Sequence, residues 1–242
     1  MVKIGQMKQI HHIQLEILRK LVFVPKLKYL QLKPNASIEN NQFDFHLNRL
    51  IDMGYVEKSD NQYRLSTKGK EYTTRMDTNT VEIMKQSKLS AWFGVMQVVD
   101  NRLQFLIYTR LKHPFYGCQG FGGGRMSFGE KIVETAEREL KEETGLDGKA
   151  EIAKMVHYRV FDRNKQLLED KIMFLCRVLN PTGTLITDME EGKYEWVDED
   201  KIKDYITNPF EEISVFMGYM KAVKEFDGQV SIEELDVETE KF

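Results

Sequence analysis

Three glutamates fall close together on one predicted helix: Glu139, Glu142 and Glu143. At about 100° per residue, the first and the third project within about 40° of each other, and Glu142 lies about 60° to one side. Crowded carboxylates repel one another and resist partial burial unless a cation joins them. Mg²⁺ typically binds carboxylates together with substrate phosphates, so the spacing predicts a Mg²⁺ (or Mn²⁺) site. The alternative is a charged face in contact with solvent.

The same stretch carries its own start and stop signals. Ser127 and Glu130 form a capping box that predicts the first turn of the helix, and Gly145 predicts its end. The predicted buried face is apolar: Ile132, Val133, Ala136 and Leu140. The opposite face holds two pairs at the i,i+4 spacing of ordinary helix ion pairs, Glu134–Arg138 and Glu137–Lys141.

Residues 124–146 match every specified position of the Nudix box, G-x5-E-x7-R-E-U-x-E-E-x-G-U with U apolar. Seven specified residues at roughly 7% usage each give a chance match near 10⁻⁸ per start position. The chain therefore resembles the Nudix hydrolases, and the surrounding strands extend the resemblance over most of residues 88–226. One position departs from the pattern: Gly122 stands where many relatives have proline, so we expect a more pliable loop.

The resemblance implies roles for individual residues. The implied metal ligands are three carboxylates and a backbone carbonyl: Glu139, Glu142, Glu143 and Gly124. Arg138 would orient this cluster through Glu130 or Glu139. Family members often add a carboxylate from a later loop, where this chain has Glu190 and Glu191. The implied reaction is attack of water at phosphorus in a nucleoside diphosphate linked to another group, with a carboxylate taking the proton.

Residues beside the box are candidates for binding a nucleotide-type substrate. Arg110 and Arg125 are candidates for phosphate contacts, and the alternative is that both are exposed arginines. Phe115, Tyr116 and Phe121 border the glycine-rich loop, where they either stack on a base or belong to the core at a strand edge. The proline that ADP-ribose hydrolases tend to have after the box is absent, so the substrate stays open.

The elements around the box predict an α+β domain over residues 88–228. Apolar and alternating runs predict strands at residues 92–99, 103–108, 153–161, 171–178 and 194–197. Asn208-Pro209 predicts the start of a last helix. We expect an α/β/α sandwich with a mixed sheet. Residues 229–242 are acidic and predict a loose C-terminal tail.

Residues 1–78 predict a separate helical module. Apolar spacing predicts helices near residues 9–22, 27–33 and 37–53, then a hairpin of residues 55–58 and 62–65 and a closing helix at 67–76. This order, and the segment of residues 47–57 in particular, resembles the winged helix-turn-helix domain. Residues 79–87 are predicted to be a linker.

The second resemblance implies a recognition helix that enters the major groove of DNA. The candidate contacts to DNA or RNA are polar side chains of this helix and of the hairpin: Asn41, Asn48, Arg49, Lys58 and Arg64. Asp44 on the same helix would repel phosphates. The alternative is a winged helix used for protein contacts, including those of a homodimer.

Composition excludes several classes of protein. The chain has 242 residues, 41% hydrophobic and 30% charged, which excludes disorder and collagen-like repeats. It contains no apolar stretch near the roughly 20 residues of a spanning helix, and no signal peptide follows Met1, so no membrane partner is expected. Cys118 and Cys176 show no metal or redox spacing, which indicates a reducing, cytoplasmic compartment.

The two modules differ in charge. Residues 1–78 hold 13 Lys and Arg against 8 Asp and Glu, whereas the rest holds 22 against 30. Two functions fit a basic front and an acidic back. One is a cytoplasmic Nudix hydrolase with a nucleic-acid-binding module, and the alternative is a transcriptional regulator that senses a nucleotide through its Nudix domain.

Overall fold

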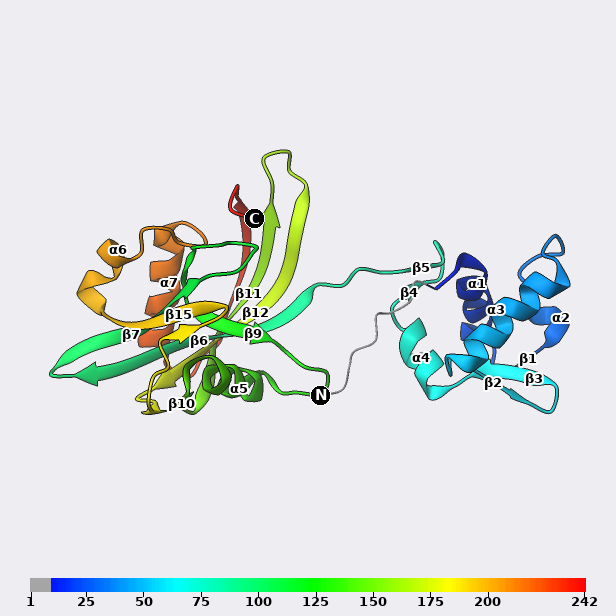
Figure 1. Cartoon of the computed structure of the whole chain (residues 1–242), viewed down its shortest axis with the longest axis horizontal. Coiled ribbons are helices and arrows are strands. Elements are labelled where there is room, and N and C mark those ends of the chain that lie inside the picture. The colour runs from blue at the N-terminus through cyan, green and yellow to red at the C-terminus, as the bar shows by residue number, and fades with distance from the viewer. Residues whose placement is uncertain (1–9) are drawn as a thin grey trace. The chain divides into compact units, whose positions relative to one another are not determined.

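The computed structural model describes residues 10–242 and divides into two compact units, one that ends at Lys85 and one that spans Gln86–Phe242 (Figure 1). The expectations about a signal peptide and about the first residue of the N-terminal helix fall on residues 1–9, outside the described part. Among the described helices, none is long and apolar enough to cross a membrane.

The first unit combines four helices with a small sheet. The helices are α1 His12–Val22, α2 Tyr29–Leu32, α3 Asn40–Asp52 and α4 Thr67–Thr73. Strands β1 Leu27–Lys28, β3 Gln62–Leu65 and β2 Val56–Ser59 form an antiparallel sheet in that order. Apolar residues at helical spacing form one core, in which Ile17, Leu18, Phe43 and Leu50 are fully or almost fully buried.

Turn residues set the boundaries of these elements. Gly54 ends α3 with a φ of 74°, and its N–H donates to the carbonyl of Ile51 at 2.8 Å. Asp60 and Asn61 adopt φ values of 52° and 57°, the left-handed pair that a tight hairpin between β2 and β3 requires. The predicted linker includes β5 Glu82–Ile83, which pairs with β4 Met76–Asp77 inside the first unit.

The second unit is built on one large mixed sheet. Its main strands run in the order β14 Asp188–Met189, β15 Gly192–Asp198, β7 Arg102–Arg110, β6 Lys88–Val99, β12 Leu167–Leu179, β11 Ala150–Phe161 and β16 Ser231–Glu238. Strands β8 Gln119–Gly120 and β9 Gly122–Arg125 pair with β7 and β6. The β12–β6 and β11–β16 pairs are parallel and the others are antiparallel.

Helices cover both faces of this sheet (Figure 1). On β7, Phe105 and Ile107 pack in the cluster that contains Phe216 of α7 Ile213–Lys224, whereas Leu106 and Tyr108 pack in the cluster that contains Leu140 of α5 Ile132–Thr144. A strand covered on both faces is apolar at every position, because neither side chain direction leads to water. The predicted α+β architecture with a mixed sheet is confirmed.

Two predictions about the C-terminal part are wrong. The acidic residues 229–242 do not form a loose tail, because β16 adds a parallel strand to β11. Its acidic side chains pair with basic ones: Lys154 lies 3.0 Å from Glu233, and Arg159 lies 2.7 Å from Asp236. The last helix begins at Ile213 with Glu212 as its N-cap, and not at Asn208-Pro209.

Candidate active site

Helix α5 carries the three glutamates and is closed by Gly145, which has a φ of 73°. Its start differs from the prediction. Lys131 is the N-cap, and the backbone N–H of Ser127 donates to Glu130 Oε2 at 3.0 Å one turn before the helix. The Ser127–Glu130 capping box is therefore wrong, because Glu130 lies outside the helix and its carboxylate has another partner.

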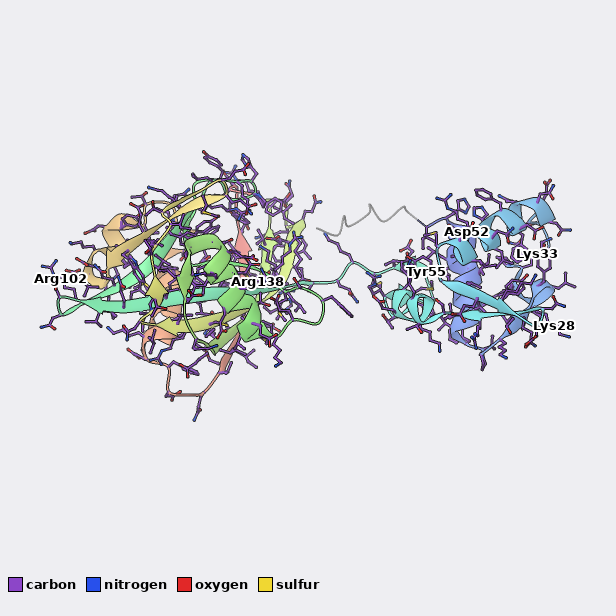
Figure 2. The ribbon with its side chains drawn as sticks, turned by 60° about the horizontal axis from the view of Figure 1, so that its bottom comes forward. Lys28, Lys33, Asp52, Tyr55, Arg102 and Arg138 are labelled. Atoms are coloured by element: carbon purple, nitrogen blue, oxygen red, sulfur yellow. The ribbon has the colours of Figure 1, made fainter. Side chains whose placement is uncertain are left out.

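That partner is Arg138, which lies in the second unit (Figure 2) and hydrogen-bonds several carboxylates of the site. Its Nε donates to Glu130 Oε1 at 2.7 Å, and its Nη1 donates to Glu139 Oε1 at 2.7 Å and to Glu142 Oε2 at 3.0 Å. Its Nη2 donates to the carbonyl of Arg125 at 3.2 Å. One guanidinium thus holds three carboxylates and the loop before the helix in fixed relative positions.

The electrostatic consequence is largest at Glu130. Hydrogen bonds from Arg138 lower the pKa of Glu130 to about 2, and the neighbouring acids raise the pKa of Arg138. The predicted i,i+4 pairs do not form: Glu134 pairs with Lys131, and Lys141 pairs with Asp147. The observed partners lie three and six positions away along the chain instead of four, so the i,i+4 spacing did not identify them.

The glycines of β9 allow the loop to approach the helix and the sheet closely. A Cβ on Gly124 would lie 2.0 Å from Cδ of Glu139, and a Cβ on Gly122 would lie 2.1 Å from the hydroxyl of Tyr194. Side chains at these positions would displace the Glu139 carboxylate or the Tyr194 ring. Gly122 therefore has a packing reason to stand where relatives have proline.

Glu143 has a different environment from the other acids of α5. Burial raises its pKa to about 7, and the Tyr194 hydroxyl donates a hydrogen bond to its Oε2. Burial also raises the pKa of Tyr194, which is 1% exposed. A carboxyl group that titrates near neutral pH beside a cavity marks a candidate for proton transfer.

A cavity of about 690 Å³ lies beside α5 and β9. Several predicted site residues line it: Arg110, Phe115, Phe121, Gly124, Arg125, Glu139, Glu143 and Glu191. Others do not: Glu142 has a side chain 62% exposed and paired with Arg138, and neither Tyr116 nor Glu190 is among the lining residues. Within residues 10–242, no three His, Cys, Asp or Glu side chains are grouped to hold a metal ion.

The aromatic residues predicted to stack on a base lie apart from one another. Phe115 is buried against Phe210, and Phe121 is buried between Phe105 and Phe216. Tyr116 is 57% exposed and contacts only the ring of His113 among its aromatic neighbours in the described chain. Both buried rings thus belong to the core, which was the alternative for them.

Basic side chains stand at the mouth of the cavity. Arg110 donates from Nε to the carbonyl of Pro114 at 2.6 Å, which fixes its guanidinium at the cavity edge. Glu191 pairs with Lys112, and the Tyr108 hydroxyl donates to the Glu191 carbonyl at 2.8 Å. Sequence reasoning missed Lys112 and Tyr194, because no local motif contains them and only strand pairing brings them to α5.

The first unit places the predicted nucleic-acid contacts on its surface. Asn41 and Asn48 are exposed on α3, and Lys58 and Arg64 are exposed on the hairpin. Arg49 is half-buried, and Arg64 pairs with Glu57 at 2.8 Å. The carboxylate of Asp44 accepts a hydrogen bond from the Tyr29 hydroxyl, so it does not face solvent alone.

Comparison with known proteins finds sequence and structural relatives of this chain. Among curated proteins, the chain is 30% identical to the ADP-ribose pyrophosphatase of Methanocaldococcus jannaschii over 97 residues, which are 40% of this chain and 57% of the relative's length. Among solved structures, it matches the MutT protein of Bacillus halodurans with a TM-score of 0.51 and 21% identity, over 64% of this chain and 93% of that one.

The NUDIX domain of Shewanella oneidensis NrtR, solved with ADP ribose, has the same TM-score of 0.51 at 18% identity, over 64% of this chain and 96% of that one. At these identities the two structures show the fold. The family model described as NUDIX domain matches residues 89–215, more than half of the chain. The complete box on α5, the mixed sheet that supports it and this match show that the chain belongs to the Nudix family.

Proposed function

We propose that the second unit hydrolyses a pyrophosphate bond in a nucleoside diphosphate linked to another group, with a divalent metal such as Mg²⁺ or Mn²⁺. The observation that carries the proposal is the shared cavity. Glu139 and Glu143 enter it from α5, and Arg110 and Lys112 enter it from the strand and loop opposite. Acids for a metal and cations for phosphate therefore meet in one place.

The residues present fit a hard divalent cation. Glu139 and Glu143 supply carboxylate oxygens, and the absence of a side chain at Gly124 leaves its backbone within reach of the Glu139 carboxylate. These residues would hold the metal, with Glu142 as a further ligand once it parts from Arg138. When bound, the metal would neutralise phosphate charge and lower the pKa of water.

The protein's own groups perform the remaining tasks. Arg138 keeps the Glu139 carboxylate in place, and Arg110 and Lys112 would bind phosphate oxygens. Glu143 would take the proton of the attacking water as a new P–O bond forms and the bond to the leaving phosphate breaks. Without a metal, burial raises the pKa of Glu143 to about 7. A bound cation would lower that pKa, so the carboxylate would be ionised and ready to accept the proton.

The name of the curated relative supports the substrate class. The Methanocaldococcus protein is an ADP-ribose pyrophosphatase, whose named substrate is a nucleoside diphosphate linked to ribose. The match spans 57% of that relative, so the substrate of this chain is a proposal. Cys118 and Cys176 are both buried free thiols, which suits the cytoplasmic location that we propose.

The test is a metal-dependent assay of the full chain against nucleoside diphosphate sugars, dinucleoside polyphosphates and nucleoside triphosphates. We expect release of monophosphate or phosphate with Mg²⁺ or Mn²⁺ and none after exhaustive chelation. Glu139→Gln should lose at least about 100-fold in turnover. Glu134→Gln, on the same helix but exposed and paired with Lys131, is the matched control and should keep it. Activity that survives chelation would contradict the metal.

For the first unit we propose a winged-helix module that binds DNA or RNA. Four exposed polar or basic side chains on α3 and the hairpin support it. Asp44 keeps its negative charge while it accepts the Tyr29 hydrogen bond, so it counts against a phosphate contact at its own position. Contacts to phosphate make affinity fall steeply with salt. Titration of labelled duplex and single-stranded RNA at several salt concentrations tests this, and absence of any binding at low salt would favour protein contacts or a homodimer.

A nucleotide-sensing regulator is the second candidate function. The division into two units at Lys85 favours it, because a binding module and a sensor need separate folds. Sensing requires reciprocity: the nucleotide must change nucleic-acid affinity, and nucleic acid must change nucleotide affinity by the same factor. Titrating a variant that binds without hydrolysing, Glu143→Gln, measures that factor. A factor of one leaves a hydrolase with an attached binding module.

A further inference from the structure

The cavity is also lined by aromatic side chains that no motif contains. Trp92 from β6, Tyr158 from β11 and Tyr219 from α7 line it. The Trp92 ring lies 5.5 Å from the Tyr219 ring and 6.1 Å from the Tyr158 ring. Trp92 is half-buried, whereas Tyr158 and Tyr219 are 4% and 2% exposed and reach the cavity only at its wall. Tyr158 hydrogen-bonds Glu211, and this group of four residues is called the aromatic recess below.

The recess contains buried polar atoms that lack partners. Glu211 is 8% exposed and Tyr219 is 2% exposed, and both line the cavity. Glu211 Oε2 and Tyr219 Oη find no hydrogen-bond partner in the described part of the chain. A buried polar group without a partner costs roughly 1–3 kcal/mol, so two such atoms at one cavity wall need an explanation.

The protein groups around Glu211 do not satisfy both oxygens of its carboxyl group. Tyr158 hydrogen-bonds the carboxyl group, and Lys241 is the nearest cation that acts on it, yet burial raises the pKa of Glu211 to about 7. Lys241 itself donates to the Pro209 carbonyl at 2.6 Å. The carboxyl therefore keeps one oxygen available inside the cavity, beside a hydroxyl that is also available.

An aromatic surface with an acceptor and a donor at its edge fits a flat heterocycle with the complementary pair. Nucleobases stack on aromatic side chains, and an amino group next to a ring nitrogen or carbonyl presents a donor beside an acceptor. We propose that the aromatic recess binds the base of the substrate and that Glu211 and Tyr219 select a base that carries an amino group. This inference rests on the proposed function, since it assigns the nucleoside end of the same substrate.

The aromatic residues beside the glycine-rich loop are poorer candidates for base recognition than the recess. Phe115 and Phe121 face the cavity but offer no hydrogen-bonding group, and Tyr116 does not line it. The recess and the glutamates Glu139 and Glu143 of α5 line the same cavity, so one substrate can contact both. Lys171 is the register partner of Tyr158 on the neighbouring strand and also lines this cavity.

The test compares nucleotides with and without an exocyclic amino group, and in the CMP and UMP pair a carbonyl replaces that group. The full chain is titrated calorimetrically with AMP and purine riboside monophosphate, with GMP and IMP, and with CMP and UMP. In at least one pair the amino form should bind about tenfold more tightly or better, because its partner leaves Glu211 unpaired. Monophosphates contain no pyrophosphate bond, so the result does not depend on whether the protein is a hydrolase.

Variants assign the selectivity to the recess. Glu211→Leu should reduce the ratio of the selective pair to about one, and Tyr219→Phe should reduce it several-fold without changing the ring. Glu212→Leu, the exposed neighbour, is the matched control and should leave the ratio unchanged. The proposal is overturned if none of these nucleotides binds, if no pair is distinguished, or if Glu211→Leu and Tyr219→Phe both keep the ratio. Selectivity without hydrolysis would instead contradict the proposed reaction alone.

Discussion

The two units differ in whether they bury charged side chains. In the first unit the buried polar residues are neutral, namely Gln14, His46, Ser66 and Thr73, and the acids and bases lie toward the surface. In the second unit Glu169 and Glu211 are buried, and Glu143 is sufficiently desolvated to titrate near pH 7. All three line one cavity.

This difference indicates which kind of ligand each unit can bind. Burying a carboxylate is costly unless it has a partner. Lys88 and Lys171 pair with Glu169, whereas one carboxylate oxygen of Glu211 has no partner in the described part of the chain, which indicates a site that is completed by a ligand. Surface charges cost little and interact through solvent, which suits contacts to a charged polymer that salt can screen. The following predictions test that division, from the largest expected effect to the smallest.

The largest effect should follow Glu143→Gln. It removes the group proposed to take the proton and a carboxylate proposed to bind metal, so turnover should fall by at least about 100-fold. Glu142→Gln should lose less, because Glu142 lies outside the cavity lining. Steady-state rates with Mg²⁺ on a verified substrate measure both. Near-normal turnover of Glu143→Gln would break the link between desolvation and function.

A pH effect on stability should follow from Glu211. Burial raises its folded-state pKa from 4.5 to about 7, so the protonated form is favoured in the fold. The stability that this preference contributes is fully present below about pH 4.5 and is lost as pH rises through 7, a loss of about 3 kcal/mol.

Glu211→Gln should remove that loss. As pH rises from about 5 to about 8, the unfolding free energy of the variant should therefore increase relative to that of the wild type. Denaturant unfolding at several pH values measures the shift. The Tyr158 hydroxyl and Lys241, which face Glu211, are unchanged in the variant. A pH-independent difference would show that Glu211 titrates normally.

An intermediate effect should follow Gly124→Ala. The added Cβ would lie 2.0 Å from Glu139 Cδ, so the carboxylate must move and turnover should fall about tenfold or more. Gly218→Ala is the matched control, because a Cβ there meets nothing within 4 Å. In helix α7 it should raise stability by about 0.5–1 kcal/mol and leave turnover unchanged. Equal rates for the two variants would refute the close approach as a positioning device.

A smaller effect belongs to the first unit. Arg49→Ala and Arg64→Ala should each reduce the slope of log affinity for nucleic acid against log salt by about one. Arg102→Ala is the matched control, since Arg102 lies on the second unit at the β6–β7 turn (Figure 2) and should leave the slope unchanged. Fluorescence anisotropy over a salt series measures all three slopes. A slope unaffected by either substitution would indicate that other surfaces carry the binding.

The smallest effect should be that of cutting between the units. A chain of residues 86–242 contains the whole cavity and its own core, so hydrolysis should stay within about twofold of the full chain. Nucleic-acid binding should vanish with the first unit. A large loss of turnover in a folded fragment would show that the first unit completes the site.

Local sequence patterns were sufficient for the elements near the box. The spacing of residues 124–146, the apolar face with Leu140 and the stop at Gly145 each depend on neighbours within one or two helical turns. The continuous apolar run of β7 is equally local, and the hairpin turn at Asp60-Asn61 follows from residues that tolerate positive φ. These features were therefore predictable from composition and periodicity.

Tertiary structure decided what depends on distant partners. Residues 231–238 form a strand beside β11, where their acids meet basic residues and Leu235 and Val237 pack against the core. Arg138 pairs with Glu139 and Glu142 of its own helix and with Glu130 of the loop before it, and not with the predicted partner Glu134. Glu211 looks like any surface acid in the sequence, and only the packing of α7 against the sheet desolvates it. Burial and long-range pairing are properties of the fold, and no local pattern records them.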